Sequence, residues 1–253
     1  MTAAPSKPRT LRFHLTSLVF VSVVPLLIFA VIIAALLEKQ QHTSLERSFR
    51  DTVRALTVAV DHELTSSISV LQALATSEHL DTGDLKLFYR EAQRVVATRP
   101  GWITINLTDV SGQQLINVYR PFGAQLPSIG HLEDVRHTLD TGEPAISNLF
   151  TGLVLKVPTV GLTVPVRRRG TLKYALGARL DVGNLSLLLS EGKLPPDWVA
   201  MIFDRQGTIL ARTRGIEQWL GKPAPAAFVT QSRQSEEGAN RAVTKDGVAV
   251  YGA

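Results

Sequence analysis

The hydropathy pattern is dominated by one uncharged, apolar run of 23 residues, from Leu15 to Leu37. As an α-helix with about 1.5 Å of rise per residue, this run would be about 34 Å long, enough to cross the roughly 30 Å hydrocarbon core of a bilayer. A cleavable signal peptide has a shorter apolar core, of about 7–15 residues, and ends at a small-residue site that is missing here. The pattern therefore predicts a transmembrane helix over residues 15–37.

The charges beside this run indicate its orientation. Residues 1–14 contain three basic residues and no acidic one, whereas the first eight residues after the run contain only Lys39 as a basic residue. Because cytoplasmic flanks carry an excess of lysine and arginine, residues 1–14 are predicted to be a cytoplasmic basic tail. Residues 38–253 are then expected on the other side of the membrane.

After the run, apolar residues recur about every 3.6 positions, from Leu45 through Leu56 and Leu64 to Leu74. This is the period of one helix face, so the sequence predicts an amphipathic helix over residues 38–80, about 60 Å long, that continues the transmembrane helix. The stripe alone would equally suit an ordinary core helix. The length favours a stalk, and its first half could pair with a second copy of the chain, so a homodimer is expected.

From Trp102 onward the apolar pattern has a period of two, which is typical of β-strands. The expected helices cover residues 85–98, 131–139 and 184–189, and the expected strands cover 102–107, 113–120, 159–166 and 171–181, with turns at 109–112 and 167–170. The predicted fold class is therefore α+β, with antiparallel sheets that follow the long helix.

One hairpin pattern occurs twice. A tryptophan, an apolar strand and an Asp-x-x-Gly turn occur between Trp102 and Gly112 and again between Trp198 and Gly207, with the two turns 95 residues apart. Two copies favour a duplicated α+β module. The predicted domains are a first module over residues 81–191 and a second, incomplete module over 192–253.

Composition and motifs exclude several classes of function. The chain has a net charge of +5 and no cysteine, and its basic residues are scattered without interleaved aromatics. A nucleic-acid partner and a disulfide scaffold are therefore not expected. His131 and His137 are six positions apart on one predicted helix, which does not suit a shared metal ion. No phosphate-binding glycine loop, G-x-S-x-G or H-E-x-x-H motif occurs, so the sequence predicts no catalytic residue, metal or cofactor.

The whole pattern resembles an extracytoplasmic double Cache sensor of a bacterial receptor. The matching segments are Gly101–Val118, Thr141–Ser147 and Leu162–Asp181 in the first module, and Ile202–Gly207 and Leu220–Pro223 in the second. The resemblance implies a membrane helix that runs into a long scaffold helix and then two tandem PAS-like sheets. It also implies a small-molecule ligand, a place in the bacterial inner (cell) membrane with residues 38–253 periplasmic or extracellular, and signal transduction, most like the input region of a sensor histidine kinase.

Other outputs stay open at this point. The same resemblance suits the input region of a chemoreceptor or of a cyclic-di-nucleotide enzyme, and a stand-alone membrane-anchored binding protein is a further alternative. Members of the family normally complete the second sheet and cross the membrane again, whereas this sequence stops at Ala253 within a strand pattern. We therefore expect a fragment or a truncated product, and any enzymatic activity would belong to a parent histidine kinase.

The predicted ligand site lies on the first module's sheet, on the face away from the long helix. Alternation directs Ile103, Ile105 and Leu107 toward the long helix. The opposite face then carries Trp102, Thr104 and Asn106. The candidate ligand-binding residues on this face and at the strand ends are Trp102, Asn117, Tyr119, Arg120, Arg179 and Asp181.

The chemistry of these candidates suits a small polar molecule. Arg120 or Arg179 could hold a carboxylate in a bidentate pair, Asp181 could hold an ammonium group, and Trp102 and Tyr119 could form the walls. Tyr119, Arg120 and Asp181 loosely resemble the pattern of amino-acid-binding Cache domains, but the Trp-Tyr pair that follows the arginine there is missing. An amino acid and a small carboxylate or other anion are therefore equal alternatives, and Asp181 could instead cap the next helix.

Overall fold

The computed structural model describes residues 22–23, 29, 33, 51–192, 194–195, 198–234, 240–243 and 249–252. The chain divides into two compact units, Met1–Asp51 and Thr52–Ala253. The predicted basic tail and the predicted transmembrane helix over 15–37 lie outside the described residues, apart from four positions, as does the stalk segment 38–50. Within the part of the chain that is described, no helix is both long enough and apolar enough to cross a membrane.

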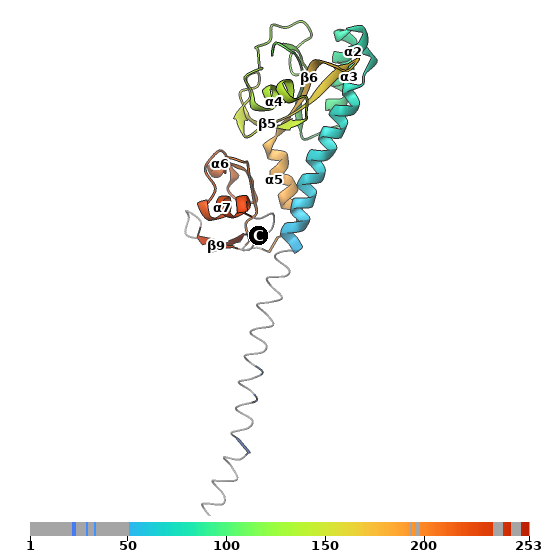
Figure 1. Cartoon of the computed structure of the whole chain (residues 1–253). Coiled ribbons are helices and arrows are strands. Elements are labelled where there is room, and N and C mark those ends of the chain that lie inside the picture. The colour runs from blue at the N-terminus through green and yellow to red at the C-terminus, as the bar shows by residue number, and fades with distance from the viewer. Residues whose placement is uncertain are drawn as a thin grey trace, which may run out of the picture. The chain divides into compact units, whose positions relative to one another are not determined.

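The long helix is described over residues 51–75 and ends earlier than predicted (Figure 1). An interruption at Thr76 and Ser77 separates it from the short helix α2 (Glu78–Thr82), and α3 (Leu85–Ala97) follows. Arg168 donates through Nη2 to the carbonyl oxygens of Ala75 and Ser77, at 2.9 and 3.0 Å. Carbonyl groups at a helix C-terminus lack intrahelical partners and attract positive charge, so this arginine stabilises the end of the helix.

Six strands form one antiparallel sheet in the order β2-β1-β6-β5-β3, with β4 also paired to β5. The strands are β1 (Trp102–Asp109), β2 (Gln114–Asn117), β3 (Ala145–Ile146), β4 (Phe150–Thr151), β5 (Pro158–Arg168) and β6 (Thr171–Asp181). Helix α4 (Glu133–Thr141) lies between β2 and β3 in the chain, and α5 (Val182–Glu191) follows β6 directly. The predicted α+β class with an antiparallel sheet is confirmed, and the two-residue strands β3 and β4 are additions to the predicted elements.

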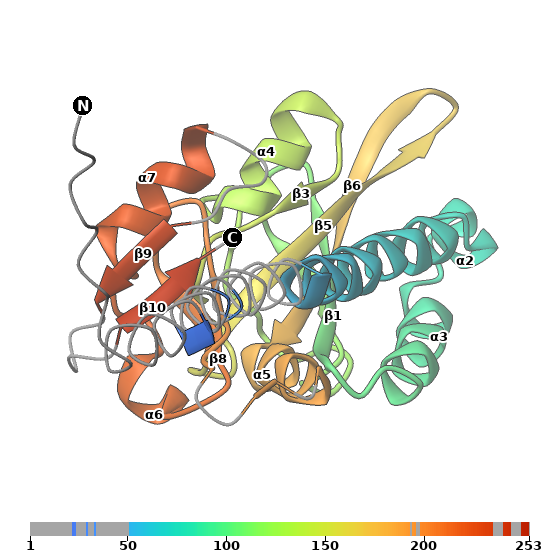
Figure 2. The same ribbon diagram turned by 90° about the horizontal axis from the view of Figure 1, so that it is seen from below.

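The sheet lies between two groups of helices. Figure 2 shows the β5–β6 hairpin with α4 on one side and the long helix on the other. The core on the long-helix side joins Leu71 and Leu74 of that helix and Phe88 of α3 to apolar residues of the sheet. These sheet residues are Trp102, Ile105, Leu107, Ile116, Leu162, Val164, Val166, Leu176, Ala178 and Leu180. The predicted packing of the helix stripe on the sheet is therefore observed.

Two predicted orientations, those of Trp102 and Ile103, are wrong, and a β-bulge is the reason. The pairing of β1 with β6 shifts between Trp102, opposite Leu180, and Thr104, opposite Arg179, so that Ile103 is an extra residue. An extra residue reverses the alternation on its N-terminal side. Trp102 therefore faces the long helix, where its Nε1 donates to Ser67 Oγ at 3.1 Å, and Ile103 faces the other way.

The two repeated hairpin turns have the same geometry. In each turn the aspartate carboxylate accepts backbone N–H groups two and four residues later, from Ser111 and Gln113 for Asp109 and from Gln206 and Thr208 for Asp204. Each turn ends in a glycine with positive φ, 87° at Gly112 and 82° at Gly207. The repeat seen in the sequence is thus a repeat of local structure, which supports the duplicated module.

The segment predicted as the second module, residues 192–253, contains smaller elements. They are β7 (Met201–Phe203), β8 (Ile209–Arg212), α6 (Ile216–Trp219), α7 (Ala226–Gln234), β9 (Asn240–Val243) and β10 (Ala249–Gly252), with β7 paired to β8 and β9 to β10. A separate apolar cluster joins Leu210 and Ala211 of β8 to Leu185 and Leu189 of α5 and to Leu56 of the long helix. The second module therefore packs on the helix that leaves the first sheet.

Candidate functional site

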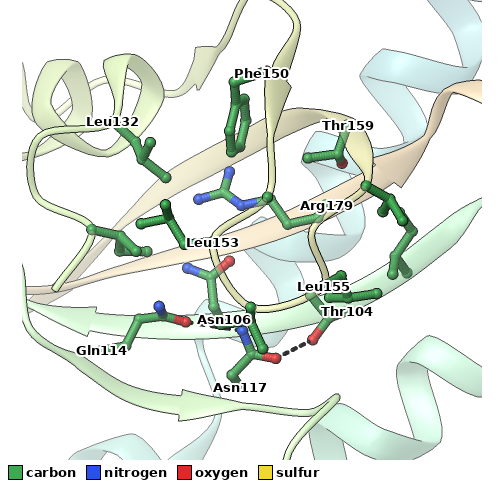
Figure 3. A pocket seen from close by; sticks show the side chains of 15 residues that line it. Thr104, Asn106, Gln114, Asn117, Leu132, Phe150, Leu153, Leu155, Thr159 and Arg179 are labelled. Carbon is green, nitrogen blue, oxygen red and sulfur yellow. Dashed lines mark hydrogen bonds between the residues drawn. The ribbon is translucent and has the colours of Figure 1, made fainter. Parts of the chain in front are cut away.

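The face of the first sheet that is turned away from the long helix carries a small cavity (Figure 3). Its floor is formed by β1, β2, β5 and β6, and it is covered by Leu132 before α4, by Phe150 of β4 and by the segment 152–157 that joins β4 to β5. The apolar lining residues are Ile103, Ile129, Leu132, Phe150, Leu153, Val154, Leu155 and Val157, and the polar ones are Thr104, Asn106, Gln114, Asn117, Thr159 and Arg179. The cavity volume is about 30 Å³, which is room for about two water molecules.

A buried ion pair stands at one side of this cavity. Arg179 of β6 donates through Nη1 to Oδ2 of Asp134 of α4, and Thr163 Oγ1 donates to the same oxygen at 2.6 Å. Asp134 is fully buried, and Arg179 is 7% exposed. The guanidinium carbon lies 5.3 Å from the centre of the Phe150 ring. Arg179 Nη2 and Asp134 Oδ1 are buried without a hydrogen-bond partner among the described residues.

Two glycines in the middle of strands make room for this polar cluster. A side chain at Gly161, which pairs with Arg179 across β5 and β6, would collide with Arg179 Nη1 and would lie 2.5 Å from Asp134 Oδ2. A side chain at Gly177 would lie 2.9 Å from Thr163 Oγ1 and 3.1 Å from Asn106 Oδ1. Glycine inside a strand weakens it, so it commonly marks a place where another group approaches the backbone closely.

A second polar network covers the cavity floor on β1 and β2. Thr104 Oγ1 donates to Asn117 Oδ1 at 2.9 Å, Asn117 Nδ2 donates to Gln114 Oε1 at 2.9 Å, and Gln114 Nε2 donates to the Pro127 carbonyl at 3.1 Å. Asn106, beside this chain, donates weakly to Thr108 Oγ1 at 3.5 Å, and its Oδ1 has no partner within the described part of the chain.

The structure brings two of the six predicted ligand residues, Asn117 and Arg179, to this cavity. Trp102 lies on the opposite face of the sheet because of the bulge at Ile103, so its expected place on the ligand face is corrected.

The other three candidates lie at the strand ends. Tyr119 and Arg120 are exposed after β2, with the Arg120 guanidinium 5.9 Å from the centre of the Tyr119 ring. Asp181 is exposed and accepts a hydrogen bond from Gly183 N at 2.8 Å as the N-cap of α5, which was the alternative role considered for it. A ligand contact by these three residues stays a prediction.

The sequence-based set lacks several residues of the cavity and the ion-pair partner of Arg179 beside it. Asp134 is one of several acidic residues on an amphipathic helix, and such residues are normally exposed. It is buried and paired with Arg179 because α4 packs on the sheet. Phe150 and Leu153–Leu155 lie in a segment without any periodic pattern. The signal that could have located the site is the pair of glycines within otherwise apolar strands, Gly161 and Gly177.

Comparisons with known proteins identify the fold. No family model matches the sequence. No curated protein matches it in sequence either. Methyl-accepting chemotaxis protein X has a TM-score of 0.63 at 15% identity, over 80% of this chain and 89% of that one. The extracellular domain of mmHK1S-Z2, a histidine kinase by its name, has a TM-score of 0.60 at 11% identity, over 81% and 90%. The ligand-binding domain of the Pseudomonas fluorescens chemoreceptor CtaA, in complex with L-isoleucine, has a TM-score of 0.57 at 12% identity, over 81% and 84%.

These similarities concern the fold, since the sequences are very different. The predicted resemblance to Cache-like sensor domains is confirmed at that level: the matching structures include extracellular domains of histidine kinases, ligand-binding domains of chemoreceptors and a methyl-accepting chemotaxis protein. The chain spans 35% of the length of another match, the extracellular ligand-binding receptor from Desulfohalobium retbaense, with a TM-score of 0.54.

Proposed function

We propose that this chain is the extracytoplasmic, small-molecule-binding input region of a bacterial sensor histidine kinase. The observation that carries the proposal is the cavity of the first module, which is covered by apolar side chains and contains buried polar atoms that have no hydrogen-bond partner among the described residues. Buried polar groups are nearly always hydrogen-bonded in folded proteins, so such atoms are expected to meet a ligand or water. The fold shared with extracellular ligand-binding domains supports the same reading.

The proposal includes the membrane arrangement predicted from the sequence. Residues 1–14 would be cytoplasmic, residues 15–37 would span the inner membrane, and residues 38–80 would form the stalk of a homodimer. The module over residues 81–191 would be membrane-distal and would bind the ligand, and the module over 192–253 would be membrane-proximal. A ligand would act by favouring one of two positions of the long helix relative to its dimer partner, which requires different affinities for the two states.

Two hydrogen bonds connect the second module to the segment that leads into the cavity. Asp204 Oδ2 in its hairpin turn accepts a hydrogen bond from Leu149 N at 3.0 Å, and Arg205 Nη2 donates to the Ile146 carbonyl at 2.5 Å. The segment between these two contacts leads directly into Phe150, which lines the cavity. A ligand that moves Phe150 would therefore also move the contact between the modules.

A chemoreceptor input region is the second candidate, because the methyl-accepting chemotaxis protein matches this fold at a TM-score of 0.63. The coding sequence that follows the Ala253 codon separates the candidates. A further apolar run and a kinase domain would support the proposal, a methyl-accepting domain would support the chemoreceptor, and a stop codon would support a stand-alone binding protein.

Ligand binding is tested by a thermal-shift and calorimetric screen of the full chain in detergent against amino acids, carboxylates, amines and amides. Amino acids belong in the screen because structures that match this fold include ligand-binding domains of chemoreceptors in complex with GABA, L-isoleucine and L-glutamine. The matched variants are Gly161→Ala, whose methyl group would collide with Arg179, and Thr171→Ala, which shortens an exposed side chain at the start of β6, outside the cavity. We expect a hit that Thr171→Ala keeps and Gly161→Ala loses, and a screen without any stabilising compound would refute the proposed function.

A further inference from the structure

The charge and hydrogen-bonding state of the cavity define the class of its ligand, provided that the proposed function is correct. We infer that the cavity binds a small uncharged molecule with one hydrogen-bond acceptor, one hydrogen-bond donor and a compact apolar body, such as an aliphatic amide. Anions and zwitterions, including free amino acids, are then poor ligands of this cavity.

The charge argument rests on the ion pair. Arg179 is the only charged side chain among the described residues that line the cavity, and its charge is already balanced by Asp134, which is fully buried. A ligand carboxylate beside Arg179 would add a buried negative charge with no counter-ion, and the cost of removing such a charge from water is large. Asp134 is not part of the cavity wall, so an ammonium group in the cavity would find no carboxylate partner there.

The hydrogen-bond argument rests on two atoms. Arg179 Nη2 is a buried donor, and Asn106 Oδ1 is a buried acceptor, and neither has a partner among the described residues. The other polar groups of the floor already have hydrogen-bond partners. Thr104, Asn117 and Gln114 are linked in series, and the series ends at the Pro127 carbonyl. Thr159 Oγ1 donates to the Leu180 carbonyl at 2.7 Å. The cavity therefore offers one donor and one acceptor, and its ligand needs one of each.

The two atoms come from the same face of the sheet. Asn106 pairs with Gly177 on β6, and Arg179 is two residues further along that strand, where side chains share a face. Figure 3 shows the Arg179 guanidinium group between the Phe150 ring and the Asn106 amide. An amide carries a carbonyl oxygen and an N–H group on the same carbon atom. Its oxygen could accept a hydrogen bond from Arg179 Nη2 while its N–H group donates to Asn106 Oδ1. The apolar part of the molecule would then meet Leu153 and Leu155.

The small volume of the cavity limits the size of the apolar body. About 30 Å³ is filled by two waters, so an isopropyl group fits only if the half-buried Leu153 turns outward. Leu153 belongs to the turn in which Lys156 N donates to the Gly152 carbonyl at 2.8 Å, which is outside the sheet. Substitutions at Leu153 should therefore change the cavity without unfolding the module.

Three probes that share an isopropyl group and differ in charge test the inference on the full chain in detergent. They are isobutyramide, isobutyrate and L-valine, and their affinities are measured by isothermal titration calorimetry or ligand-observed NMR. We expect isobutyramide to bind at least about tenfold more tightly than the other two, which is the effect of one buried hydrogen bond or uncompensated charge.

Variants connect the binding to the cavity. Asn106→Leu removes the acceptor, and Leu153→Trp fills the space from the half-buried turn, so both should weaken isobutyramide binding at least about tenfold. Asn184→Leu, on α5 and outside the cavity, is the matched control and should bind like the wild type. Leu153→Trp keeps the test decisive if Asn106→Leu does not fold.

Each other outcome overturns the inference. Equal or tighter binding of isobutyrate or L-valine that Leu153→Trp abolishes would refute the uncharged ligand class but leave the sensor function standing. Isobutyramide binding that neither variant weakens would refute the site. If none of the three probes binds, the ligand class is wrong, and the wider compound screen decides separately whether the chain senses a small molecule.

Discussion

Replacing Arg168 by alanine should destabilise the first module by about 1.5–4 kcal/mol, because this side chain joins the end of the long helix to the β5–β6 hairpin. Its guanidinium group bonds to the carbonyls of Ala75 and Ser77 and forms an ion pair with Asp81. The side chain is 20% exposed, so most of it is shielded from water. Its removal leaves carbonyl groups at the helix end without a charged donor.

The magnitude follows from these contacts. A hydrogen bond to a charged group contributes about 1.5–3 kcal/mol. Only the Ala75 bond is counted, because the Ser77 carbonyl also accepts a hydrogen bond from Leu80 N at 3.1 Å and keeps that partner. The ion pair adds about 0–1 kcal/mol, since the Asp81 side chain is 56% exposed. Asp81→Asn should therefore cost less than about 1 kcal/mol, and the carbonyl contacts should account for the larger part of the Arg168→Ala effect.

The assay is urea unfolding of the purified chain, followed by tryptophan fluorescence and far-UV circular dichroism, with the free energy of unfolding extrapolated to water. Arg169→Ala is the matched control, because this neighbouring arginine is exposed at the turn and its replacement changes the net charge by the same amount as Arg168→Ala. It should stay within about 0.5 kcal/mol of the wild type. If Arg168→Ala is no less stable than Arg169→Ala, the helix-end contact does not stabilise the module.

Two further predictions concern the core and the contact between the modules. Trp102→Phe should lower the free energy of unfolding by about 1–2 kcal/mol in the same urea assay, because Ser67 loses its buried hydrogen-bond partner. Ligand affinity measured by calorimetry should be unchanged, and a loss of affinity would contradict the corrected orientation of Trp102. Asp204→Ala should increase hydrogen exchange at Leu149, measured by mass spectrometry, more than Asp109→Ala does. Both variants lose equivalent turn contacts, but only Asp204→Ala loses the hydrogen bond to Leu149 N that joins the modules. Equal exchange in the two variants would contradict a role of Asp204 in holding the modules together.

The candidate site shows where sequence reasoning reached its limit. Arg179 and Asn117 were identified because strand alternation directs them to one face, and they do line the cavity. Trp102 was misplaced because one extra residue in β1 reverses the alternation, and a bulge has no composition that distinguishes it from a regular strand. Asp134 was missed because its partner Arg179 is 45 residues away in the chain.

The local structure of this protein can be predicted from residues that are neighbours in the chain. The stripe with a period of 3.6 predicts the long helix, the period of two predicts the paired strands, and the Asp-x-x-Gly turns predict both hairpins, because each depends on residues that are neighbours in the chain. The apolar run over 15–37 likewise carries the membrane prediction without any tertiary contact.

The order of the strands and the grouping of the buried polar side chains depend on tertiary contacts. The order β2-β1-β6-β5-β3 brings Asn106, Gly177 and Thr163 side by side across three strands, and α4 then lays Asp134 over Gly161 beside Arg179. Such contacts join residues that are far apart in the chain. They depend on strand register and on close packing, and a one-residue shift would move each of these side chains to the opposite face of the sheet.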